Sequence, residues 1–126
     1  MFPVFAKHFA FRPTGAPPFA SGPTPAAEGW ICPREASKGL GVAEAVAIAD
    51  AWWPADFACE AGPRPMSTLA FTFELMTPLR GAPVRPLFHR ASVPRSHGGF
   101  SLELRELWDE QGTLVALNQQ TFVFIR

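Results

Sequence analysis

The sequence predicts an α+β domain in which an antiparallel sheet packs against one helix. The chain has 14 prolines and 10 glycines among 126 residues, which disfavours a helical bundle. Residues 40–53 lack proline and are rich in alanine, as expected of a helix. Several other segments alternate apolar and polar residues with the period of two that is typical of strands. A 13.8 kDa chain of which 48% is hydrophobic is large enough for one compact domain.

The elements before and within the helix follow from local patterns. Residues 4–11 and 28–33 are predicted to be short strands, separated by a proline-rich loop over residues 13–25. The helix is expected over residues 40–53, with Ser37 as a candidate N-cap and Pro54 ending it. Its apolar residues surround the axis, which indicates burial on nearly all sides.

Four further strands are predicted after the helix. Residues 68–75 alternate so that Phe71 and Phe73 share one face while Thr68 lies on the other. Residues 84–93, 100–108 and 113–125 complete the set, with a hairpin turn at residues 109–112. We expect hairpins to connect these four strands in chain order.

Charge and composition exclude several classes of protein. Eleven basic and eleven acidic residues give a net charge of zero, which offers no support for nucleic-acid binding. No apolar run approaches the roughly 20 residues of a membrane span, and no signal peptide is visible, so a cytoplasmic location is expected. The two cysteines, Cys32 and Cys59, do not form a disulfide framework.

Three polar residues stand out because their neighbours are apolar, namely Asp50, Thr68 and Gln120. Asp50 lies near the C-terminal end of the predicted helix, where both the helix dipole and desolvation disfavour a carboxylate. A carboxylate in this position suggests a function such as polarising a water molecule, although it can also face solvent or cap a backbone group. Thr68 and Gln120, each taken alone, fit structural roles in strands. No phosphate-binding loop and no metal-binding motif is present, so no metal is expected.

A basic stretch follows the first long strand. It contains Arg80, Arg85, Arg90 and Arg95, and no acidic residue occurs between Glu74 and Glu103. Guanidinium groups suit phosphates, so this stretch is a candidate for a phosphorylated ligand. The alternative is a solvated strand face. His97 lies nearby but has no acid or base partner that would mark it as catalytic.

The motifs together resemble the acyl-CoA thioesterase II family of the hotdog superfamily. The similarity runs from about residue 4 to residue 125, and its most specific parts are residues 29–34, 48–52, 67–69, 106–116 and 119–120. The resemblance implies a single hotdog domain over residues 1–126, an antiparallel sheet wrapped around one central buried helix. Members of the family carry two hotdogs in tandem, and this chain is similar to the second.

The resemblance also implies an activity and its residues. Asp50, Thr68 and Gln120 fall on the positions that hold the hydrolytic water, with Asp50 as general base or electrostatic activator and acyl-CoA as the substrate. No covalent intermediate and no cofactor is implied. Donors near Gly39 or Gly41 at the helix N-terminus would stabilise the oxyanion. By charge alone, and not from the resemblance, Arg85, Arg90 and Arg95 are candidates for binding the CoA phosphates.

A single hotdog leaves a sheet edge exposed, so we expect a homodimer or a tetramer of hotdogs, unless the chain is a fragment of a double-hotdog protein. The alternative function is a non-catalytic hotdog that binds an acyl thioester or another hydrophobic ligand. A hydratase fits less well, because the predicted helix has no histidine.

Overall fold

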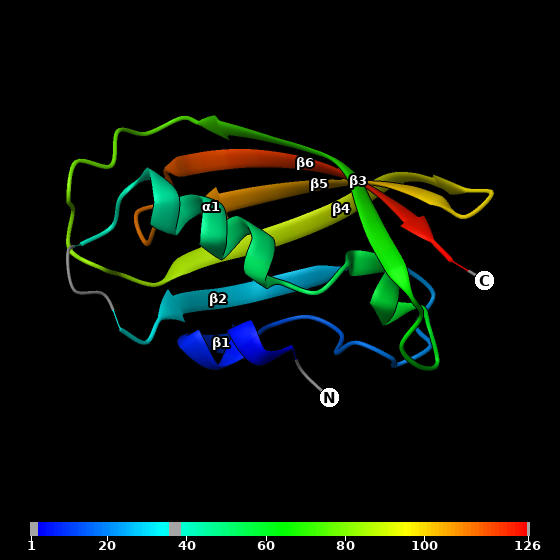
Figure 1. Cartoon of the computed structure of the whole chain (residues 1–126). Helices are drawn as coiled ribbons and strands as arrows, with labels where there is room; N and C mark the ends of the chain where they lie inside the picture. The colour runs from blue at the N-terminus through cyan, green and yellow to red at the C-terminus, as the bar shows by residue number, and fades with distance from the viewer. Residues whose placement is uncertain (1–2, 36–38, 126) are drawn as a thin grey trace.

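The computed structural model describes residues 3–35 and 39–125 (Figure 1). Six antiparallel strands form one sheet in the order β1-β2-β4-β5-β6-β3, and α1 lies across one face of it. This confirms the α+β prediction. The elements are η1 (Val4–His8), β1 (Phe9–Pro13), β2 (Ala27–Pro33), α1 (Val42–Ala51), η2 (Ala55–Ala58), β3 (Met66–Leu75), β4 (Leu87–His97), β5 (Phe100–Trp108) and β6 (Leu114–Phe124).

The N-terminal segment differs from the prediction of a strand over residues 4–11. Val4–His8 forms a 3₁₀ turn, η1, and only Phe9–Pro13 is extended and pairs with β2. Pro3 has a φ of −58°, and its carbonyl accepts a hydrogen bond from the Ala6 amide at 3.0 Å. The fixed φ of proline favours a turn at this place.

Helix α1 is shorter than predicted at both ends. It begins after Gly41, whose amide donates to Glu44 Oε2 at 3.0 Å, and Leu40 instead forms a bridge with Ala82. The predicted N-cap, Ser37, lies outside the described residues. The helix ends at Ala51, because Trp52 is extended and precedes Trp53 and Pro54.

Burial of α1 on nearly all sides is not found in this chain. The residues that face the sheet are buried, whereas the opposite side is exposed because none of the described residues forms a second layer over it. The buried residues are Ala45, Ile48, Ala49 and Ala51, and the exposed ones are Val42, Ala43, Ala47 and Asp50.

Strand β3 crosses to the far edge of the sheet and pairs with β6, so the predicted hairpin between β3 and β4 does not form. Of the four strands after the helix, only β4, β5 and β6 are neighbours in the sheet in chain order. A bulge in β3 places Leu69 as an extra residue, because Thr68 lies opposite Phe122 and Phe71 lies opposite Gln120. Phe122 and Gln120 share a face, so Thr68 shares a face with Phe71, against the prediction. One inserted residue reverses the alternation.

The turn between β5 and β6 forms as predicted. Asp109 Oδ1 accepts hydrogen bonds from the amides of Gln111 and Thr113 at 2.9 and 2.8 Å. Gly112 adopts a φ of 80°, which favours glycine.

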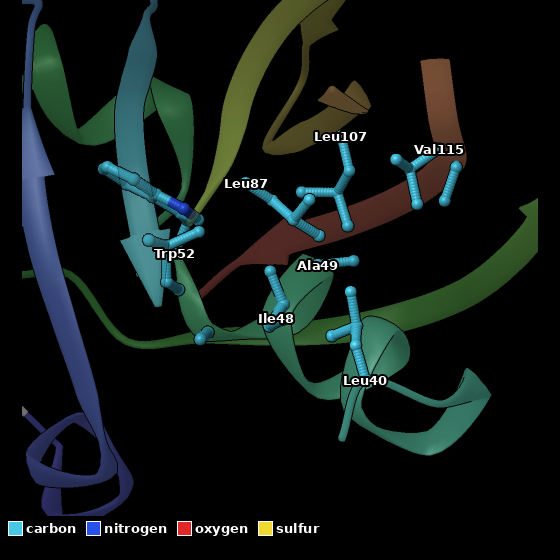
Figure 2. Close-up of a cluster of buried hydrophobic side chains, with 10 residues drawn as sticks. Leu40, Ile48, Ala49, Trp52, Leu87, Leu107 and Val115 are labelled. Atoms are coloured by element: carbon cyan, nitrogen blue, oxygen red, sulfur yellow. The ribbon is translucent and has the colours of Figure 1, made fainter. Parts of the chain in front are cut away.

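The apolar core lies between α1 and the sheet (Figure 2). Ile48 and Trp52 reach toward Leu87 and Leu107 on the central strands. The Trp52 ring meets Phe11 edge-on at 5.3 Å between ring centres. Both cysteines are free, and no helix among the described residues is long and apolar enough to cross a membrane.

Candidate active site

The structure brings Asp50 and Gln120 together, although they lie 70 residues apart in the sequence. Asp50 is the penultimate residue of α1 and is exposed, while Gln120 lies on β6 with 1% of its surface exposed. Gln120 Nε2 donates to Asp50 Oδ1 at 3.3 Å. The carboxylate therefore keeps its second oxygen, Oδ2, for another donor.

Thr68 lies on the same face of the sheet as Gln120. The bulge in β3 turns it onto the sheet face that carries Gln120, opposite Phe122 and thus two residues along β6 from Gln120. Its side chain is exposed. In the part of the chain that the structure describes, its hydroxyl forms no hydrogen bond with Asp50 or Gln120, so the three candidates share a face without forming a closed network.

Gln120 has a second partner that the sequence analysis missed. Its Nε2 also donates to Asn118 Oδ1 at 2.7 Å, and Asn118 Nδ2 donates to the backbone carbonyl of Thr72 at 2.7 Å. Asn118 is 3% exposed. The sequence signal that could have found Asn118 is its spacing of two residues from Gln120, which places both side chains on the same face of the strand.

A buried ion pair lies on the neighbouring strand β5 and was also missed. Glu103 and Arg105 are 1% and 2% exposed and form a salt bridge. Arg105 donates to the carbonyl of Ala49 at 2.7 Å, and the Ala55 amide donates to Glu103. A cation at the C-terminal end of a helix is favourable. The pair therefore holds the backbone on both sides of Asp50.

His89 is fully buried beside this layer. Its ring stacks on Trp52 with 4.8 Å between ring centres, and its Nδ1 lies 3.1 Å from the carbonyl of Ala27. Burial lowers the pKa of His89 well below 6.5, the nearby charge of Arg105 lowers it further, and the bond to Ala27 opposes the shift. His89 is therefore a neutral core residue and not part of a basic surface.

The three arginines proposed for phosphate binding do not form one cluster. All are exposed, and an extended segment separates Arg85 from Arg95 by about 30 Å. Arg90 lies on the sheet face that points away from α1, because its neighbours His89 and Ala91 are buried on the helix side. Its guanidinium donates twice to Glu106 Oε2, at 3.1 and 2.7 Å.

The N-terminus of α1 lies far from Asp50. Asp50 follows Val42 by eight positions in the helix, which is about 12 Å along the axis. The Gly41 amide is already bonded to Glu44. Gly39 has a φ of 84°, and a Cβ there would meet the Ala82 carbonyl at 2.8 Å, so a structural reason for this glycine exists. Backbone donors at Gly39 and Gly41 therefore cannot serve a carbonyl held beside Asp50 of the same chain.

An apolar cavity of about 600 Å³ opens at the C-terminal end of α1. Ala51, which lines it, follows Asp50 directly, and Met66, also lining it, precedes Thr68 by two residues. The aromatic part of its wall consists of Phe5, Phe11, Phe19, Trp52, Trp53 and Phe57. No group of three metal-binding side chains occurs within residues 3–35 and 39–125.

The arrangement of one helix across a six-stranded antiparallel sheet defines the hotdog class. Residues 1–124 match the family model of the acyl-CoA thioesterase C-terminal domain, and the chain belongs to this family. None of the curated proteins compared with the chain matches it.

Solved structures share the fold. A hot dog fold protein of unknown function from Alicyclobacillus acidocaldarius is 18% identical, with a TM-score of 0.86, covering 95% of this chain and 46% of that one. A putative thioesterase II from Thermobifida fusca is 20% identical, with a TM-score of 0.75 and coverages of 97% and 47%. The tesB protein of Mycobacterium avium subs paratuberculosis is 21% identical, with a TM-score of 0.74 and coverages of 95% and 48%. The chain thus spans about half the length of these three proteins.

Proposed function

We propose that the protein is an acyl-CoA thioesterase that hydrolyses an acyl-CoA to the free acid and CoA. The observation that carries the proposal is the hydrogen bond between Gln120 and Asp50, with Thr68 on the same face of the sheet. Membership of the acyl-CoA thioesterase family supports it. Two proteins of similar structure, a putative thioesterase II and a tesB protein, point to the same reaction class.

In the proposed mechanism, Asp50 is the general base. Gln120 holds Oδ1, and Oδ2 takes a proton from a water that the Thr68 hydroxyl helps to orient. The water oxygen bonds to the thioester carbonyl carbon and forms a tetrahedral intermediate. When the C–S bond breaks, the proton on Asp50 passes to the sulfur, so CoA leaves as a thiol. The apolar cavity beside Ala51 would receive the acyl group.

We propose that the active unit contains two hotdogs, in the simplest case a homodimer. The donors at the N-terminus of α1 lie about 12 Å from Asp50 of the same chain, so the oxyanion donors must come from elsewhere. Strand β3 is a sheet edge with Leu69 56% exposed and Phe71 39% exposed, a surface suited to a second copy. Light scattering at micromolar concentration should give twice the chain mass, and a monomer that turns over acyl-CoA contradicts the proposal.

The CoA phosphates are proposed to bind at Arg85, Arg90 and Arg95. Since the three side chains are spread out, we expect their contributions to be separable. Alanine at a contacting position should raise KM and leave kcat nearly unchanged. Arg90 should contribute least, because Glu106 already neutralises it. A KM unaffected by all three substitutions excludes this site.

The decisive experiment is a thiol-release assay over a series of acyl-CoA substrates. Asp50→Asn should lower kcat by about 10²- to 10⁴-fold while the protein remains folded. Glu110→Gln, in the exposed turn between β5 and β6, is the matched control and should keep full activity. We expect the purified protein to keep its turnover after dialysis against EDTA. We also expect the activity to be found in the cytoplasmic fraction of a cell extract. Unchanged activity in Asp50→Asn rules out the proposed base.

The alternative is a non-catalytic protein that binds an acyl thioester or another hydrophobic ligand. The apolar cavity favours it independently of the polar residues, because its aromatic wall can hold an apolar chain without chemistry. Calorimetric binding of a non-hydrolysable acyl-CoA analogue, together with no thiol release for any acyl length, supports this alternative.

A further inference from the structure

We infer that Asn118 is a positioning residue that fixes the orientation of the Gln120 amide and, through it, the contact with Asp50. The orientation itself rests on hydrogen bonds within the chain, and its effect on rate rests on the proposed function. The sequence pattern does not single out Asn118. Its place on β6 and its hydrogen bond to Gln120 identify it as a candidate.

The orientation starts at a group that cannot turn. The backbone carbonyl of Thr72 can only accept a hydrogen bond, and Asn118 Nδ2 lies 2.7 Å from it. If the Asn118 amide were flipped, its oxygen would face the Thr72 carbonyl, and two acceptors would repel each other. The β3 backbone therefore sets which end of the Asn118 amide points to β6.

The second step transfers this orientation to Gln120. With Nδ2 directed at Thr72, Asn118 presents Oδ1 to Gln120, and Gln120 Nε2 donates to it at 2.7 Å. The other N–H of the same Nε2 reaches Asp50 Oδ1 at 3.3 Å. A flipped Gln120 would set its oxygen against both Asn118 Oδ1 and the Asp50 carboxylate. One amide direction alone satisfies all three side chains.

Burial makes the arrangement costly to replace. Asn118 and Gln120 are 3% and 1% exposed, so bulk water does not substitute for a lost partner. An apolar side chain at position 118 can neither donate to the Thr72 carbonyl nor accept from Gln120. Gln119, the exposed neighbour between them, makes none of these bonds among the described residues and is the matched control.

The test is a double-mutant cycle in the thiol-release assay. Asn118→Leu should lower kcat about 10- to 100-fold with little change in KM, because a small displacement of the base is enough to slow attack. In a Gln120→Ala background the same substitution should have no further effect, because Asn118 acts through Gln120. Gln119→Leu should leave both constants unchanged. An equal loss of kcat in both backgrounds means a merely structural role and overturns the inference.

A second measurement is independent of turnover. In uniformly ¹⁵N-labelled protein, the side-chain N–H protons of Gln120 should exchange slowly with solvent, and Asn118→Leu should accelerate exchange at least about tenfold. Asn118→Asp serves if the leucine variant does not fold, since it replaces the donor that faces Thr72. Unaltered exchange overturns the inference. If Asp50→Asn and Gln120→Ala keep full activity, the proposed function fails, and the exchange experiment still decides the role of Asn118.

Discussion

The face of the sheet beneath α1 has two halves of opposite character. Toward one end of the strands the helix packs on apolar groups such as Ile31, Leu87 and Leu107. Toward the other end, β5 and β6 carry a buried polar layer that consists of Ser101, Glu103, Arg105, Asn118 and Gln120. The named side chains of both halves are buried from solvent. The change occurs within a single strand, because Arg105 and Leu107 are neighbours on the helix-facing side of β5.

The two halves hold the helix in different ways. Apolar contacts lower the free energy of folding without preferring a direction, whereas the Arg105–Ala49 and Glu103–Ala55 bonds fix the backbone around Asp50 at defined atoms. A buried ion pair adds little net stability compared with an apolar isostere. The comparison teaches that the polar half contributes geometry at the end of α1 and the apolar half contributes most of the stability.

The largest effect is expected from breaking the buried pair. Arg105→Met leaves Glu103 charged, buried and without its partner, so the free energy of unfolding should fall by about 3–5 kcal/mol. Urea unfolding measures it. The double variant Glu103→Leu with Arg105→Met should regain most of the stability yet retain a reduced kcat. Full activity in that double variant contradicts a positioning role for the polar half.

Creating a cavity in the apolar half should lower the stability of the protein. Leu107→Ala removes a side chain that is 1% exposed, and unfolding should become easier by about 3 kcal/mol. The kcat of the folded protein should stay near its original value, because Leu107 is remote from the polar contacts of Asp50. A loss of kcat as large as that of Asn118→Leu erases the distinction between the halves.

Acid should act at the boundary between the two halves, where His89 lies. Its folded-state pKa is well below the ordinary 6.5, so the unfolded chain binds its proton first as the pH falls. The contribution of His89 to stability is present above pH 6.5 and is lost as the pH decreases below it, by at most about 1.4 kcal/mol per pH unit. His89→Phe should flatten the curve of unfolding free energy against pH in this window. An unchanged slope contradicts a buried neutral imidazole.

The smallest effect is expected for a partly exposed ion pair. Glu60 and Arg64 form a salt bridge at 2.9 Å with side chains that are 29% and 39% exposed. Glu60→Gln should cost less than about 1 kcal/mol, because water screens the pair. A larger loss of stability in Arg105→Met than in Glu60→Gln would show that burial makes an ion pair costly to break. A cost above 2 kcal/mol in urea unfolding means that exposure is not what separates the two pairs.

Local patterns were reliable where one element carries the signal. The period-two alternation located β5, and the turn residues Asp109 and Gly112 located the hairpin, because neighbours in sequence decide both. The same alternation on β5 did not reveal that its polar residues face α1, while Leu104 is 37% exposed and Phe100 is 52% exposed. Which face is inside depends on bonds to Ala49 and Ala55, residues about fifty positions away.

The candidate site shows the same division. The sequence by itself determined the α+β class, the helix that carries Asp50 and the strands that carry Thr68 and Gln120, since propensity and periodicity are local properties. The tertiary structure alone decided that β3 lies beside β6, that a bulge turns Thr68 toward Gln120, and that Asn118 orients Gln120. These depend on strand register and on hydrogen bonds between distant segments, and both exist only after the sheet has assembled.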